Sequence, residues 1–272
     1  MVGYDDGMTA NRRLMAAFLL TLVGACAPPA EAPDQLEDLC TYVFTHFDDD
    51  DPEALEAGLV NLDAWLADGD NLAQTVEGYQ ITNLDSAAIQ GIDTSTDKVS
   101  GLVGAAVAKE HPWKLRDMAV ATVTADWAEV VPKNYDVYER TFSKDESCFP
   151  GKDCKRISAT SYAEAKFAGL VQVVTRNRIQ FRWVESEELG WVLLHRSWLT
   201  EPAEVSIDSI NVYAQYFLAV TLPDSNNTTR MMATWMDADY GALPVTEDGM
   251  KREIVKSMSK QGDAIDEWLA TD

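Results

Sequence analysis

Residues 173–185 read VVTRNRIQFRWVE, and this stretch decides the fold class. Its apolar residues Ile179, Phe181 and Trp183 are each separated by one polar residue. Side chains that alternate with a period of two point to opposite faces of a β-strand. The stretch therefore predicts a strand with one buried face, and with a second face that carries Arg176, Arg178, Gln180 and Arg182.

Five further segments predict the rest of an antiparallel sheet, at residues 135–142, 162–168, 191–199, 210–222 and 229–239. The last two are separated by PDSNN at residues 223–227, a run of turn-forming residues that predicts a hairpin. A short strand is also suggested at residues 79–81. Residues 99–107, VSGLVGAAV, fit a strand or a helix, because their small side chains leave the period ambiguous.

Helical spacing predicts four helices around this sheet. Leucines three and four residues apart indicate a helix over residues 53–66. Pro112 favours a helix start before residues 113–123, and Pro132 ends a shorter helix that begins near residue 124. Residues 247–269 carry an apolar stripe and predict one long amphipathic helix. The stripe consists of Met250, Ile254, Met258, Ile265 and Leu269.

The N-terminus has the layout of an export signal. Arg12 and Arg13 precede an apolar run of about ten residues, which is too short to span a bilayer. The run ends in Val-Gly-Ala-Cys at residues 23–26, which is similar to the lipobox of bacterial lipoproteins. The resemblance implies a signal peptide over residues 1–25 and a lipid on Cys26. Residues 26–35, rich in Pro and Ala, then form a tether. In that family, Ala27 suggests sorting to the outer membrane, facing the periplasm.

The charge of the chain excludes one class of partner. It has 45 acidic and 22 Lys and Arg residues, for a formal net charge of −23. Removal of residues 1–25 takes away two basic and two acidic residues and leaves this charge unchanged. Nucleic-acid binding requires Lys and Arg to replace phosphate counterions, so no nucleic-acid partner is expected.

The cysteines favour an oxidising compartment. Cys148 and Cys154 flank a turn-forming spacer and are predicted to form a disulfide. Cys40 is then left unpaired, or is itself the partner of one of the other two.

Motifs of the common enzyme classes are not found. The sequence has no G-x-S-x-G, no phosphate-binding glycine loop and no H-E-x-x-H. Its three histidines, His46, His111 and His195, stand in unrelated contexts. We therefore expect no metal, no cofactor and no enzymatic activity. Two hypotheses fit the basic row formed by Arg176, Arg178 and Arg182. It binds an anionic ligand or partner, or it pairs with acids on neighbouring strands.

The order of elements resembles the helix-grip fold of the START lipid-transfer superfamily over roughly residues 97–270. The resemblance rests on this order and on three short sequence segments, at residues 126–132, 165–170 and 239–244. The resemblance implies an α+β fold in which a curved antiparallel sheet of about six to seven strands packs on the C-terminal helix. Residues 97–272 would form this domain. Residues 36–96 would be a helical and irregular extension, either a cap on the sheet or a separate interaction segment.

Relatives of this superfamily hold hydrophobic molecules in a cavity between sheet and helix. The strand residues expected to line it are Trp183, Leu193, His195, Tyr216 and Trp235; the helix residues are Met250, Ile254 and Met258.

The sequence thus predicts an envelope lipoprotein that binds a hydrophobic small molecule or lipid. One alternative is a scaffold with a solid core, whose protein partner is unknown. The other is an enzyme of the polyketide-cyclase type, with His195 and Tyr216 as its polar pair.

Overall fold

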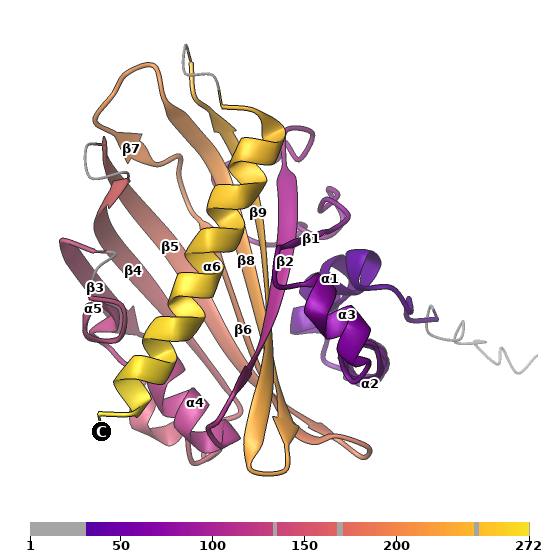
Figure 1. Ribbon diagram of the computed structural model, residues 1–272. Helices are drawn as coiled ribbons and strands as arrows, with labels where there is room; N and C mark the ends of the chain where they lie inside the picture. The colour runs from indigo at the N-terminus through magenta and orange to yellow at the C-terminus, as the bar shows by residue number, and fades with distance from the viewer. Residues whose placement is uncertain (1–30, 133–134, 168–170, 242–244, 272) are drawn as a thin grey trace, which may run out of the picture.

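The computed structural model describes residues 31–132, 135–167, 171–241 and 245–271. Cys26 and the predicted signal peptide lie outside the described residues. The fold is α+β, with helices on both faces of one curved antiparallel sheet (Figure 1). The long C-terminal helix crosses one face, which confirms the predicted helix-grip architecture.

The sheet formed by the described residues has nine strands in the order β1-β2-β9-β8-β6-β5-β4-β3, with β7 paired to β5. Two of the nine, β1 and β7, are only two residues long, and the other seven match the predicted number. The bounds are β1 Tyr79–Gln80, β2 Val103–His111, β3 Val137–Phe142, β4 Arg156–Phe167, β5 Val171–Ser186, β6 Gly190–Leu199, β7 Glu204–Val205, β8 Asn211–Asp224 and β9 Asn227–Asp239.

Helices precede the sheet, interrupt it and follow it. The bounds are α1 Leu36–Thr45, α2 Glu53–Leu66, α3 Gly69–Gln74, α4 Leu115–Val123, α5 Trp127–Val130 and α6 Glu247–Leu269, with 3₁₀ turns at His46–Asp48 and Glu146–Cys148. None of the described helices is both long enough and apolar enough to cross a membrane.

Different helices cover the two faces of the sheet. We call the face toward α6 the inner face and the face toward α1 and α2 the outer face. In β5, Phe181 and Trp183 belong to the inner face, as the alternation predicts. Arg182 belongs to the outer face, where its Nη1 donates to the carbonyl of Phe47.

The largest apolar cluster of the described residues lies on the outer face. Phe44 of α1 meets Tyr216 of β8 and Trp235 of β9 edge-on, with ring centroids 6.0 and 5.6 Å apart. The leucines of α2 that predicted its helix are buried in the same cluster. Residues 36–96 therefore cap the sheet and share its core.

The ambiguous segment at residues 99–107 contributes the strand β2, and its small residues have a packing role. Gly104 lies on the outer face, where a Cβ atom would stand 2.7 Å from Cδ1 of Trp235 and 2.8 Å from Cγ1 of Ile81. The absence of a side chain at this position leaves room for both.

Helix α6 begins at the N-cap Thr246, whose Oγ1 accepts from the Gly249 N–H at 3.1 Å. The predicted stripe faces the molecule, with Met250, Ile254 and Met258 buried against β2, β8 and β9. Farther along, Ile265 is buried against α4 and α5. The helix thus crosses the inner face diagonally, from the β7 end of the sheet toward α4 (Figure 1).

Candidate ligand site on the inner face

Six of the eight predicted lining residues lie on the inner side of the sheet. Trp183 and Leu193 belong to a cluster with Phe181, and His195 stacks on Phe181 with ring centroids 4.8 Å apart. Met250, Ile254 and Met258 form a second cluster beneath α6. The two clusters are distinct, so the six residues share a face without forming a single contact group.

The other two predicted lining residues, Tyr216 and Trp235, lie on the outer face, and the prediction for them is wrong. Trp235 Nε1 donates to the Thr82 carbonyl at 2.9 Å, and the Tyr216 hydroxyl lies 2.6 Å from Thr94 Oγ1. Strands β8 and β9 are buried on both faces, so their apolar residues do not reveal which side points inward. Because His195 is on the inner face, it cannot act together with Tyr216 as a catalytic pair.

The apolar side chains of the inner region form separate groups. Among the described residues they fall into three clusters, around Phe181, Met232 and Trp127. Polar side chains on the inner face of the central strands, including Thr221 and Arg230, belong to none of them. The outer face, by contrast, has one continuous core. The largest continuous apolar cluster of the described residues therefore lies on the outer face.

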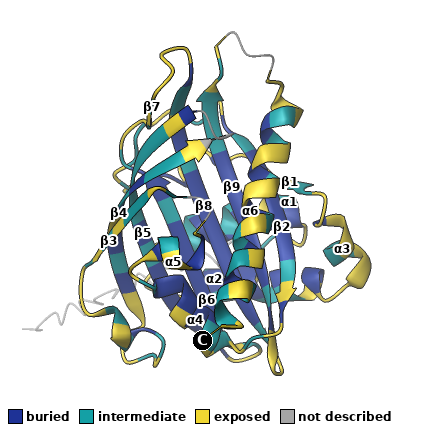
Figure 2. Ribbon diagram, turned by 60° about the vertical axis from the view of Figure 1, so that its left-hand side comes forward, coloured by how far each residue is buried: buried dark blue, intermediate teal, exposed yellow. Residues whose placement is uncertain are grey.

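One end of the inner face, which we call the open end, is partly exposed to solvent. Thr175 and Asn177 of β5, Ser197 of β6 and Gln215 of β8 are half-buried, although they point to the same side as buried Phe181 and His195. This open end lies where α6 begins. At the other end, where α4 and the last turns of α6 cover the strands, the same face is closed (Figure 2).

The closed end holds an unusual group of polar atoms. Five buried side-chain atoms of the described residues have no hydrogen-bond partner within the chain, and all five belong to β2, β6 and β9. They are Nε2 of His111, Nδ1 of His195, Oγ1 of Thr228, and Nε and Nη2 of Arg230. Buried polar groups are normally paired, so this concentration marks the place where a ligand could bind.

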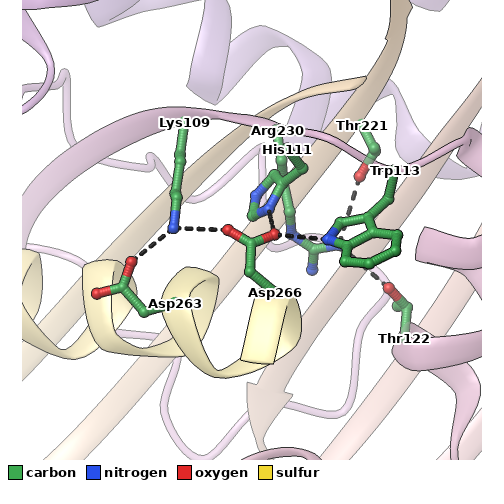
Figure 3. Close-up of polar contacts among 8 residues, drawn as sticks. All are labelled: Lys109, His111, Trp113, Thr122, Thr221, Arg230, Asp263 and Asp266. Carbon is green, nitrogen blue, oxygen red and sulfur yellow. Dashed lines mark hydrogen bonds and ion pairs between the residues drawn. The ribbon is translucent and has the colours of Figure 1, made fainter. Parts of the chain in front are cut away.

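Arg230 is the centre of this group. Its side chain is fully buried, and Nη1 donates to Thr122 Oγ1 at 3.1 Å and to Thr221 Oγ1 at 3.4 Å (Figure 3). Burial lowers the pKa of Arg230 to about 10, which leaves the guanidinium charged at neutral pH. None of the ion pairs among the described residues includes it.

His195 lies one cross-strand row away from Arg230. Its ring is held between Phe181 and Phe217, with centroids at 4.8 and 5.1 Å. Burial, followed by the charges of Arg230 and Arg140, holds the pKa of His195 well below its usual range. The imidazole is therefore neutral and can donate one hydrogen bond and accept another.

Arg140 extends the positive field from β3. Its guanidinium lies over the rings of Trp127 and Phe181, and its Nη1 donates to the carbonyls of Thr122 and Thr124, both at 3.0 Å. Arg140 thus fixes the end of α4, the helix whose Thr122 contacts Arg230.

Lys109 is the cross-strand neighbour of Arg230, and its charge is neutralised. Its Nζ lies 2.5 Å from Asp263 Oδ1 and 2.8 Å from Asp266 Oδ2, both on α6 (Figure 3). Asp266 also meets His111 Nδ1 at 2.6 Å and accepts from Trp113 Nε1 at 3.0 Å. These contacts attach the last turns of α6 to the edge of the sheet. Arg230 has no such carboxylate.

Other predicted features lie away from this site. The Sγ atoms of Cys148 and Cys154 are joined in a disulfide, and Cys40 is a buried free thiol whose Sγ lies 3.7 Å from Met231 Sδ. The basic row of β5 pairs with acids rather than forming a free anion site. Arg176 pairs with Glu201 and Glu204, and Arg178 pairs with Asp93.

Two surface hollows occur over the N-terminal helices, with volumes of about 630 and 240 Å³. Neither is lined by a residue predicted to face the cavity. In the described ranges, no group of His, Cys, Asp or Glu side chains is placed to hold a metal ion.

Sequence reasoning missed Arg230 as a site residue. The signal was present, since Arg230 is the only charged residue in the run TTRMMATW at residues 228–235. A single charge in an otherwise apolar strand indicates either an edge position or a buried polar contact.

No protein-family model and no curated protein matches the chain. Similar solved structures include human STARD10, at 8% identity and a TM-score of 0.41, which covers 75% of this chain and 78% of that one. A START superfamily protein from Mycobacterium smegmatis has 9% identity and a TM-score of 0.39, with 62% and 97% covered.

Norcoclaurine synthase from Thalictrum flavum, in complex with dopamine and hydroxybenzaldehyde, has 11% identity and a TM-score of 0.35, with 63% and 89% covered. Likenesses of this size assign neither a ligand nor an activity to this chain.

Proposed function

We propose that this chain binds a hydrophobic small molecule or lipid against the inner face of its sheet, beneath α6. A lipid on Cys26 would anchor the chain in the bacterial envelope, at the outer membrane and facing the periplasm. The observation that carries the binding proposal is the contrast between the two faces. The outer face is a continuous core, whereas the inner face has separate apolar clusters, an open end and buried polar atoms without partners.

The inner face offers the chemistry that an apolar ligand needs. Ligand sites are mostly apolar, with a few polar groups that fix orientation. Phe181, Phe217 and Met232 supply aromatic and thioether surface on both sides of His195. Methionine side chains repack easily, so Met232, Met250 and Met258 could yield space to a ligand without disrupting the outer core.

The test compares two tryptophan substitutions at half-buried serines of the same sheet. Ser197 lies at the open end of the inner face, and Ser158 of β4 lies on the outer face. The full chain would be purified from bacterial membranes in a neutral detergent. Native mass spectrometry and organic extraction would then measure apolar molecules that remain bound.

We expect the wild type and Ser158→Trp to retain such a molecule, and Ser197→Trp to lose most of it. If the wild type carries none, and gains none from a panel of fatty acids, phospholipids and sterols, the binding proposal is wrong. A scaffold with a solid core would then replace it, and a search for a protein partner would follow.

The anchor is tested separately. Metabolic labelling with a tagged fatty acid should modify the wild-type chain and leave Cys26→Ala unlabelled, and only the wild type should fractionate with membranes. Equal labelling of both would contradict the anchor and leave the binding proposal untouched.

A further inference from the structure

We infer that Arg230, with His195 beside it, forms an anion site that receives the acidic end of an apolar ligand. The ligand would enter head first, with its carboxylate or phosphate at the closed end and its apolar chain directed toward the open end. This inference rests on the proposed function and names the chemical class of its ligand.

The charge of Arg230 is isolated from acidic side chains. Arg230 and Lys109 are opposite each other on β9 and β2, and both point to the inner face. Lys109 has two carboxylates within 2.8 Å, whereas Arg230 has two threonine hydroxyls and no acid (Figure 3). A buried charge without a counterion is energetically unfavourable. A ligand that carries a negative charge would supply the missing counterion.

The two unpartnered nitrogens of Arg230 have the geometry of a bidentate anion site. Nε and Nη2 lie on the same edge of the planar guanidinium, and their N–H bonds are nearly parallel. That edge binds the two oxygens of a carboxylate or phosphate in a bidentate pair. Nη1, which makes both contacts to threonine, is on the other side. The chain thus holds Arg230 through one end and leaves its two-donor edge free.

The other unpartnered atoms lie on neighbouring positions of the same face. Thr228 precedes Arg230 by two residues on the inner face and is the cross-strand partner of His111. His195 belongs to the adjacent row, through its pairing with Ala219 and the pairing of Ala219 with Met232. A ligand head group at Arg230 would therefore be within reach of donors on three strands.

An apolar path leads from Arg230 toward the open end. Beyond the cross-strand row of His195, Ala219 and Met232, the next row toward the open end contains Ser197, Phe217 and Thr234. The row after that contains Gln215 and Met236. Burial decreases along these rows, from fully buried Arg230 to half-buried Gln215. An extended apolar chain can follow the rows outward, flanked by the clusters of Phe181 and Met232.

The experiment measures which end of the ligand the protein recognises. The full chain in neutral detergent would be titrated with dodecanoate, dodecyl phosphate, dodecanol and acetate, with native mass spectrometry as the readout. We expect the wild type to bind dodecanoate or dodecyl phosphate at least about tenfold more tightly than dodecanol, which corresponds to 1.4 kcal/mol. The stronger of the two acids identifies the head group.

The matched variants are Arg230→Met and Arg196→Met. Both remove a buried arginine from the same sheet, but Arg196 lies on the outer face and pairs with Asp48. Arg230→Met should bind the acid no better than the alcohol, and Arg196→Met should keep the wild-type preference. Arg230→Lys keeps the charge without the two-donor edge, so we expect an intermediate preference. It also serves if Arg230→Met fails to fold.

The outcomes separate this inference from the proposal on which it rests. Equal binding of dodecanol and dodecanoate would leave the proposed function standing and overturn the anion site. Binding of acetate as tight as that of dodecanoate would also overturn the inference, because the apolar chain would then contribute nothing. If no twelve-carbon compound binds, and the wild type carries no extractable ligand, both the inference and the proposed function fail.

Discussion

At the scale of single residues, two buried arginines show how the faces of the sheet differ. Arg196 is 2% exposed on the outer face and is fully partnered. Its Nη2 pairs with Asp48, Nη1 donates to the Phe44 carbonyl at 3.1 Å, and Nε donates to Gln180 Oε1 at 2.8 Å. These contacts connect β6 to α1, to the turn after it and to β5. Arg196 is thus held by a carboxylate and two further acceptors, whereas two nitrogens of Arg230 have no partner.

Removing the acid that pairs with Arg196 should destabilise the fold. In Asp48→Ala, Arg196 stays buried with a charge that no carboxylate neutralises, although its bonds to Phe44 and Gln180 remain. We expect the free energy of unfolding to fall by about 2–3 kcal/mol. Urea denaturation would measure it. Asp50→Ala, an exposed position in the same acidic run, is the control and should stay within about 0.5 kcal/mol of wild type.

His195 should make stability depend on pH near neutrality. Its pKa in the folded chain is held well below its usual range by burial, whereas in the unfolded chain it is near 6.5. As pH falls below about 6.5, the unfolded state binds a proton that the folded state does not. The free energy of unfolding should then fall by up to about 1.4 kcal/mol per pH unit.

The measurement is urea denaturation at pH 7.0 and 5.5 for the wild type and His195→Phe. Because the pKa of His111 is also lowered by burial, the variant should lose only part of the pH dependence. A pH dependence that is unchanged in His195→Phe would contradict a buried neutral imidazole.

At the scale of the elements, β2 depends on a glycine that admits two side chains from neighbouring segments. Gly104→Ala would place a Cβ atom 2.7 Å from Cδ1 of Trp235 and 2.8 Å from Cγ1 of Ile81. Cβ atoms in folded proteins do not come this close to other heavy atoms. We expect a loss of about 1–3 kcal/mol in the free energy of unfolding.

The control for Gly104→Ala is Gly69→Ala, at the start of α3, where nothing lies within 4 Å of an added Cβ. It should leave stability unchanged or raise it slightly. Thermal denaturation of both variants checks the pair. An equal loss in both would show that glycine flexibility, rather than crowding, is responsible.

The strands also show which features of the sheet a sequence pattern can predict. Alternation correctly separated Phe181 and Trp183 from Arg178 and Arg182 in β5, because one side of that strand is apolar and the other basic. It failed for Tyr216 and Trp235, because β8 and β9 are buried on both sides and carry large apolar residues on each. The residues that bury their outer side are on α1 and α2, far away in sequence. A local pattern cannot reveal which distant segment covers a strand.

At the scale of the whole molecule, the N-terminal helices and the sheet form one folding unit. Phe44 of α1 and Leu59 of α2 are fully buried in the cluster that also contains Tyr216, Leu218 and Trp235 of the sheet. The boundary suggested by sequence, between residues 96 and 97, is a change in the type of element, and the core continues across it.

A chain that begins at residue 97 should therefore not fold on its own. Its outer face would expose the large apolar side chains that α1 and α2 cover, and such a patch promotes aggregation. We expect residues 97–272 to be insoluble or to lack fixed tertiary structure, and residues 31–272 to be soluble and folded. Size-exclusion chromatography and near-UV circular dichroism distinguish these outcomes. A monomeric, ordered 97–272 fragment would contradict a shared core.

Sequence thus predicted the architecture of the molecule better than its site. The helix-grip order, the long α6 and its apolar stripe follow from periodicity, which is a local property. The group around Arg230 comes from β2, β6, β8, β9 and α4, and its distinguishing feature is that no carboxylate pairs with Arg230. An absent neighbour leaves no trace in a sequence, so this feature required the three-dimensional arrangement.

The largest apolar core of the described residues lies on the face opposite the proposed ligand site. Substitutions that reshape the inner face therefore need not disturb that core. Inner-face positions such as Phe217, Ala219 and Met232 could be varied together in a library while the residues between them hold the fold. The proposed site could then be retargeted to new ligands, because the outer core is formed by the chain alone.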